Sequence, residues 1–98
     1  MDSLTDISAI REILNRHGFR FSKSLGQNFL INPAVCPRMA RECGADGETG
    51  VIEVGPGIGV LTRELALRAK KVVAVELDRR LLPVLSETLD GFGNVSVI

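Results

Sequence analysis

The feature that most constrains this chain is a glycine-rich segment between two apolar stretches. The first stretch, residues 51–54, runs directly into Gly55-Pro56-Gly57-Ile58-Gly59. The second, residues 72–75, ends at Glu76, which lies 21 residues after Gly55. A strand, a glycine loop, a helix and a second strand ended by an acid make up half of a nucleotide-type binding fold. Because a carboxylate can accept hydrogen bonds from both ribose hydroxyls, the pattern predicts a site for a ribose-bearing cofactor.

The length of the chain limits how much of such a fold it contains. At 98 residues it provides one small domain at most, whereas a doubly wound α/β domain usually has more strands than this length supplies. Residues 94–98 also read as a strand that stops at the chain end. We therefore expect an N-terminal piece of a longer protein.

The net charge is zero, but the charges are unevenly distributed. Residues 11–41 contain six basic residues and one acidic residue, which gives +5, and residues 42–98 contain six basic and nine acidic residues, which gives −3. A basic front segment suits an anionic partner such as RNA. An ordinary solvated surface explains the same charges equally well.

Cysteine and histidine usage argues against a metal site. Cys36 and Cys43 lie seven residues apart without a Cys-x-x-Cys pair, and the chain has one histidine. We expect both cysteines to be small core residues, not zinc ligands or a disulfide. No apolar run approaches the ~18 residues of a membrane span, and the first residues lack a secretory pattern. The sequence predicts a cytoplasmic protein with no metal and no membrane partner.

Two helices are expected before the first strand. Apolar residues at helical spacing predict a helix over residues 6–17, followed by Gly18 as a left-handed cap. Asn32-Pro33 is a typical helix start, but Pro37 leaves open whether the second helix kinks there or begins there. The second helix is expected to end near Gly44, with three residues facing inward: Met39, Ala40 and Cys43.

After the glycine loop the pattern alternates helices and strands. A helix of about ten residues is expected after Gly59, and the strand that ends at Glu76 follows it. Asp78 is the expected N-cap of a further helix, which has Pro83 near its start and carries four leucines: Leu81, Leu82, Leu85 and Leu89. A strand at 95–98 completes the order helix, helix, β-α-β-α-β.

The spacing of the glycines separates the possible cofactors. A dinucleotide loop follows Gly-x-Gly-x-x-Gly, but here Val60 occupies the place of the third glycine. A P-loop does not fit, because no Lys-Ser or Lys-Thr follows. The form Glu53-x-Gly-x-Gly-x-Gly59 instead resembles the loop of S-adenosylmethionine-dependent methyltransferases. Both acids have alternative roles: Glu53 could orient the loop by accepting backbone N–H bonds, and Glu76 could cap the helix that follows it.

Residues ahead of the loop make the resemblance specific. Lys23-Ser-Leu-Gly-Gln-Asn-Phe-Leu30, followed by Asn32-Pro33, resembles the segment that precedes the glycine loop in the ribosomal RNA adenine N6-dimethyltransferases. Residues 53–57 and 75–78 match the same family, and the resemblance spans nearly all of residues 8–98. Macrolide-resistance methyltransferases and mitochondrial transcription factors share this core. The leading helix favours the bacterial small-subunit enzymes.

The resemblance implies an S-adenosyl-L-methionine-dependent enzyme that dimethylates adenosine N6 in small-subunit ribosomal RNA. Asn28 and Leu30 would contact the methionine end of the cofactor, and Gly55 and Gly57 would form the floor beneath it. Glu76 would hold the ribose hydroxyls. The adenine would be flanked by Leu77, and the basic residues around Lys23 would meet rRNA phosphates.

The implied fold class is α/β, the first half of a Rossmann-like methyltransferase domain preceded by N-terminal helices. Residues 1–50 would form the helices and a cofactor-closing segment, and residues 51–98 the first βαβαβ part. The motif that receives the target base would lie beyond Ile98, so no catalytic residue is assigned and the chain alone is expected to be inactive. Two alternatives stay open: a non-catalytic RNA-binding or transcription-factor relative, and an NAD-dependent dehydrogenase, which Val60 disfavours.

Overall fold

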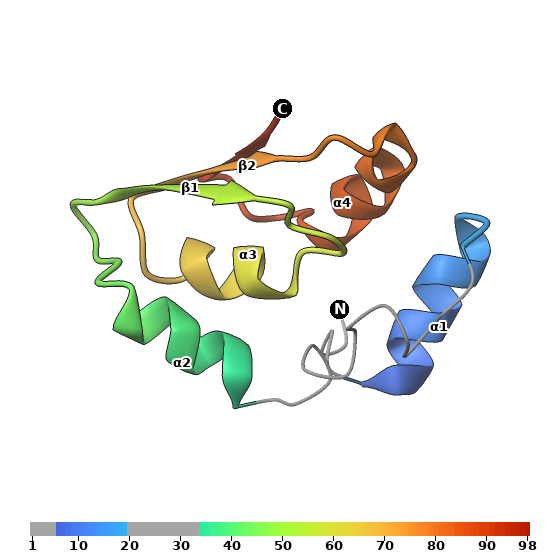
Figure 1. Ribbon diagram of the computed structural model, residues 1–98, viewed down its shortest axis with the longest axis horizontal. Helices are drawn as coiled ribbons and strands as arrows, with labels where there is room; N and C mark the ends of the chain where they lie inside the picture. The colour runs from blue at the N-terminus through green and yellow to red at the C-terminus, as the bar shows by residue number, and fades with distance from the viewer. Residues whose placement is uncertain (1–5, 20–33) are drawn as a thin grey trace.

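Three parallel strands form the sheet of this computed structural model, which describes residues 6–19 and 34–98. The strands are β1 (Gly50–Val54), β2 (Lys71–Val75) and β3 (Val95–Val97), in the order β1-β2-β3. Helix α3 (Val60–Ala66) connects the first two strands, and α4 (Leu82–Thr88) the last two. Both crossovers run in the same direction across the sheet, which places their helices on one face (Figure 1). The predicted β-α-β-α-β order is confirmed.

Helix α1 spans Ile7–Arg16, which is within one residue of the predicted bounds at each end. The Asp6 carboxylate accepts a hydrogen bond from the Ser8 N–H at 2.9 Å at the start of the helix. Gly18, at φ +80°, is the predicted left-handed cap, and its N–H donates to the Asn15 carbonyl. His17, between them, is the C-cap residue.

Helix α2 spans Val35–Glu42, so Pro37 lies in its first turn, where the missing N–H of proline costs no helical hydrogen bond. The expected N-cap, Asn32, lies outside the described residues. The prediction of inward residues was right for Ala40 and wrong for Met39 and Cys43, which are both exposed. The buried stripe is instead Cys36 and Ala40, four residues apart, while Cys43 has reached the end of the helix and donates its thiol to the Ala40 carbonyl.

The stretch after β2 begins with a turn of 3-10 helix, η3 (Arg79–Leu81), before α4 starts at Leu82. Asp78 is the predicted cap, because its carboxylate accepts a hydrogen bond from the Arg80 N–H at 3.0 Å. Of the predicted leucines, Leu85 and Leu89 are buried, whereas Leu82 is exposed. The tighter 3-10 turn shifts the buried face of the following helix, which carries Val84, Leu85 and Thr88.

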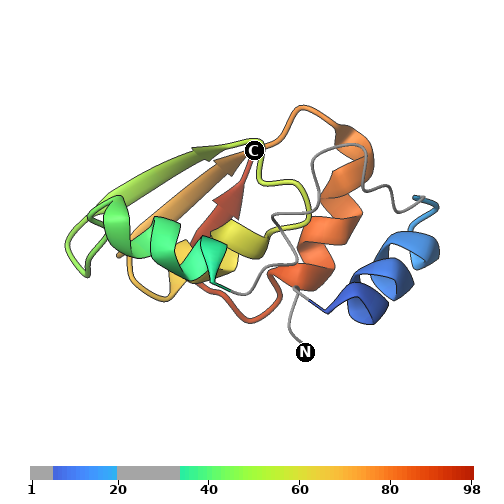
Figure 2. The ribbon, with the colours of Figure 1, turned by 60° about the horizontal axis from the view of Figure 1, so that its bottom comes forward.

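In the part of the chain that the structure describes, the helices cover one face of the sheet. Figures 1 and 2 show α2 and α3 together on the same side of β1 and β2. On the opposite face, the side chains of Ile52 and Val54 are 75% and 79% exposed. Within β2, by contrast, Val72 and Ala74 on the helix-covered face are fully buried. The predicted division of the chain at residue 50 stays a prediction.

Candidate cofactor site

The carboxyl ends of β1 and β2 bring the glycine loop and the predicted acid together. The Gly55 N–H donates to the Val75 carbonyl at 2.9 Å, which extends the ladder between the strands into the loop. Gly55 and Gly57 have φ of +72° and +61°, and an added Cβ at either would meet no atom within 4 Å. Both glycines therefore expose backbone to open space, which is the geometry of a loop that a ligand can approach closely.

Gly59 has a different role from the other two glycines. Its φ is +95°, and an added Cβ would lie 3.0 Å from the Thr88 hydroxyl and 3.2 Å from a methyl of Leu89. The residue is also the N-cap of α3, and its carbonyl accepts a hydrogen bond from the Arg63 N–H. Gly59 thus allows α4 to pack against the loop, and it belongs to the support of the site, not to its floor.

Glu76 lies at the centre of the candidate site. One carboxylate oxygen accepts the Gly57 N–H at 3.3 Å, and the other accepts the Asp78 N–H at 3.0 Å. Its own N–H is held by the Ile98 carbonyl at 2.9 Å. Glu76 therefore does stabilise the turn after β2, as the alternative reading expected. Because each carboxylate oxygen can accept two hydrogen bonds, the same side chain keeps capacity for a ligand's hydroxyls.

Of the three remaining predicted site residues, the structure describes one, Leu77. Leu77 follows Glu76 and is 91% exposed, so an apolar side chain stands in solvent directly beside the carboxylate. Asn28 and Leu30 lie outside the described residues. The structure thus brings together four of the six predicted positions, Gly55, Gly57, Glu76 and Leu77, at one end of the sheet.

Glu53 takes part in an interaction that the sequence did not predict. The expected donors were backbone N–H groups of the loop, but the donor in the structure is the side-chain hydroxyl of Thr62, a fully buried residue of α3. Burial raises the pKa of the Glu53 carboxyl, and the hydrogen bond from Thr62 partly offsets that effect. The pair joins the end of β1 to the first turns of α3, across the base of the glycine loop.

Glu53→Gln is expected to stabilise the chain by an amount that grows as the pH rises above about 4.5, the ordinary glutamate value. Because the folded chain holds the Glu53 proton more tightly than the unfolded chain, wild type loses stability as the pH rises through the raised pKa. Urea unfolding from about pH 4 to about pH 8 measures the difference. Glu42→Gln removes an exposed carboxylate as the control, and a pH-independent difference for Glu53→Gln would contradict the expectation.

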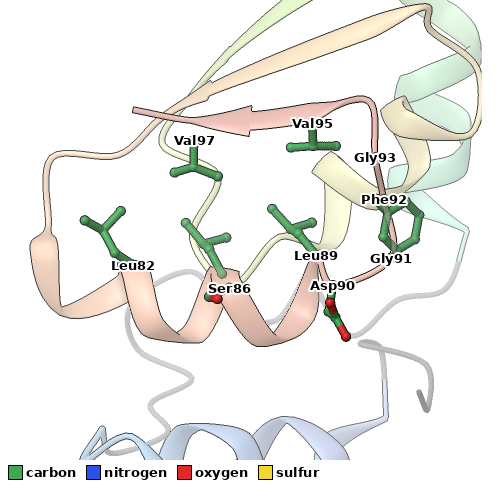
Figure 3. Close-up of a pocket in the computed structure, with 10 residues that line it drawn as sticks. Leu82, Ser86, Leu89, Asp90, Gly91, Phe92, Gly93, Val95 and Val97 are labelled. Carbon is green, nitrogen blue, oxygen red and sulfur yellow. The ribbon is translucent and has the colours of Figure 1, made fainter.

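The structure has a groove away from these residues. A groove of about 560 Å³ separates α4 from β3, with Leu82, Ser86 and Leu89 facing Val95 and Val97 (Figure 3). Its walls are mainly apolar, and none of its lining residues belongs to the glycine loop or is Glu76. The groove lacks the converging polar groups of a cofactor site, so the loop and the strand end remain the candidate.

A comparison with known families decides what kind of protein has this loop. Residues 18–98 match the family described as ribosomal RNA adenine dimethylase. The chain belongs to that family. A curated relative, ribosomal RNA small subunit methyltransferase A of Bacillus licheniformis, is 58% identical over 88 residues, which are 90% of this chain and 30% of the relative. The chain thus spans about three tenths of the length of that relative.

Solved structures agree with the family assignment. The 23S rRNA methyltransferase ErmE is 40% identical, with a TM-score of 0.65 over 68% of this chain and 28% of that one. A dimethyladenosine transferase from Plasmodium falciparum is 28% identical, with a TM-score of 0.62 over 68% and 25% of the two chains. The predicted fold class, the first part of a Rossmann-like methyltransferase domain, is confirmed.

No helix within residues 6–19 and 34–98 combines the length and apolarity needed to span a membrane. Over the same ranges, no three side chains of histidine, cysteine, aspartate or glutamate gather closely enough to hold a metal ion.

Proposed function

We propose that this chain forms the part of a cytoplasmic enzyme that binds the methyl donor. The enzyme dimethylates adenosine N6 in small-subunit ribosomal RNA. The observation that carries the proposal is the contact between the Gly57 N–H and the Glu76 carboxylate, in a chain of the rRNA adenine dimethylase family. It joins an open glycine loop to a carboxylate suited to a ribose. S-Adenosyl-L-methionine is the cofactor that supplies a methyl group to such an enzyme.

The residues of the site fit that cofactor. Gly55 and Gly57 leave open space above their backbone, which suits a ligand lying against it. Glu76 would accept hydrogen bonds from the ribose hydroxyls, and the exposed Leu77 would lie against the adenine. Asn28 and Leu30 are proposed for the methionine end on the family resemblance alone. The basic residues of the N-terminal segment would contact phosphates of ribosomal RNA.

The chain is expected to bind S-adenosylhomocysteine and not NADH. Val60 occupies the position of the third glycine of a dinucleotide site, so the loop does not have the pattern that binds a pyrophosphate. Isothermal titration calorimetry of the 98-residue chain with each ligand makes the comparison. Binding of NADH alone would favour the dehydrogenase alternative.

A chimera tests the RNA part of the proposal. In the Bacillus licheniformis relative, the 88 matching residues are replaced by those of this chain. The chimera is expected to transfer labelled methyl groups from S-adenosylmethionine to immature small ribosomal subunits, with the unaltered relative as the control. A folded chimera without transfer would favour the non-catalytic RNA-binding alternative.

A further inference from the structure

One side chain of the glycine loop reaches into the apolar core. Ile58 lies between Gly57 and Gly59 and is only 6% exposed. It belongs to a cluster of seven buried residues, three of which come from α1: Ile10, Ile13 and Leu14. Glycines on both sides of Ile58 permit many backbone conformations, so the packing of this side chain restricts the loop together with the hydrogen bonds of Gly55 and Gly57. The N-terminal helix is therefore part of the wall behind the candidate site.

The end of α1 is tied to α4 through a single carboxylate. The Arg16 guanidinium donates to both oxygens of Glu87, each at 2.7 Å, and His17 Nε2 lies 3.1 Å from one of them. A two-pronged pair of this kind fixes orientation as well as distance. Arg16 first, and His17 second, hold the pKa of the Glu87 carboxyl below its ordinary range, so Glu87 is ionised at neutral pH.

A second set of contacts links the end of α1 to the segment after β2. The Phe19 N–H donates to the Leu14 carbonyl at 2.7 Å, and the Arg80 guanidinium lies 5.2 Å from the centre of the Phe19 ring. Arg80 is also paired with Asp78 at 2.8 Å, two residues beyond Glu76. The end of α1 is thus connected to both sides of the candidate site, the loop and the strand that carries the acid.

Helix α4 joins these contacts. Thr88 and Leu89 lie against Gly59, while the neighbouring Glu87 holds Arg16. Figures 1 and 2 both show α1 alongside α4. One helix therefore contacts the loop directly and also fastens the helix that packs against Ile58.

We propose that Glu87 is a positioning residue for the cofactor loop: it holds α1 against α4 so that α1 supports Ile58. Among residues 6–19 and 34–98, the polar partners of the Glu87 side chain are Arg16 and His17 at the end of α1, so its effect on the loop passes through that helix. The inference deepens the proposed function and rests on it for the identity of the ligand. That α1 supports the loop is inferred from the packing of Ile58 with α1 and does not depend on which ligand binds.

Hydrogen exchange in the 98-residue chain tests the support. In Glu87→Gln, the amides of Gly57 and Gly59 are expected to exchange about threefold to tenfold faster, while the β2 amide of Val72 changes little. Arg16→Gln breaks the same pair from the other side and should give the same pattern. The control is Glu42→Gln, which removes an exposed pair with Arg38 on α2.

The double variant Arg16→Glu, Glu87→Arg restores an ion pair of reversed polarity, and slower loop exchange than in the single variants is expected. Unchanged loop exchange in Glu87→Gln would overturn the proposal. Equal acceleration of the loop and β2 would overturn it too, because it marks a general loss of stability.

Calorimetry with S-adenosylhomocysteine separates this inference from the proposed function. The dissociation constant of Glu87→Gln is expected to be about threefold to tenfold above that of wild type. A wild-type chain that binds no S-adenosylhomocysteine counts against the proposed function, and the exchange result then still decides whether α1 supports the loop. Equal affinity in wild type and Glu87→Gln would overturn the positioning role for the cofactor.

Discussion

Replacing Gly59 with valine is expected to lower the free energy of unfolding by about 2–5 kcal/mol, from backbone strain and overpacking together. The φ of +95° is unfavourable for any residue with a Cβ, and most of all for a β-branched one. The new Cβ would also meet the Thr88 hydroxyl at 3.0 Å and methyl groups of Leu89 and Leu85 at 3.2 and 3.3 Å. Urea unfolding followed by circular dichroism measures the loss.

Gly91→Val separates the two causes. Gly91 has a nearly equal φ of +90°, but a Cβ there meets nothing within 4 Å. Its replacement is expected to cost about 1–2 kcal/mol, the backbone strain alone. Equal losses at both positions would show that the contact between Gly59 and α4 does not matter for stability.

Glu76→Ala is expected to weaken S-adenosylhomocysteine binding by about 1.5–3 kcal/mol, the usual worth of hydrogen bonds to a charged acceptor. That loss corresponds to an affinity lower by about tenfold to 150-fold. Calorimetry of the 98-residue chain gives the change. The acid is expected to matter because it lies between the glycine loop and the turn at Asp78, where a ribose would be received.

The turn at Asp78 provides the matching control. Asp78→Ala removes the cap of η3 and leaves Glu76 in place, so it tests whether the cap alone affects the ligand. A loss of stability without a loss of affinity is expected for Asp78→Ala. If Glu76→Ala behaves in the same way, Glu76 serves only to stabilise the turn.

The arrangement of the strands and the loop was predictable because it depends on local patterns. Apolar runs of strand length, bounded by glycines and an acid, define β1, the loop and β2 without reference to the rest of the molecule. The caps at Gly18 and Asp78 follow from the same local chemistry. These are also the features that position Glu76 at the loop.

Other features depend on contacts between distant elements, and the sequence did not indicate them. The three glycines look alike in the sequence, but only Gly59 meets α4, 29 residues further on at Thr88. The partner of Glu53 is likewise set by where α3 lies. Thr62 was open to prediction as a polar residue in an apolar helical stripe beside Leu61, Leu65 and Ala66.

The errors on buried faces have a common origin in short helices. In α2, eight residues with Pro37 in the first turn leave the angle of the apolar stripe poorly fixed, and Met39 was assigned to the wrong side. Before α4, a 3-10 turn of three residues changes the angular spacing, and Leu82 is left exposed at the open groove between α4 and β3. A period derived for a regular α-helix does not carry across such a junction.

The bare face of the sheet bears on how this chain behaves in solution. Strand β1 is the first strand of the order β1-β2-β3, so within the described residues one side of its backbone pairs with no other strand. Ile52 and Val54 add an exposed apolar surface beside that edge. Unprotected edges of this kind favour intermolecular sheet formation and aggregation. Protein concentration therefore becomes a variable to control in each measurement above, since association through β1 would imitate a change in stability.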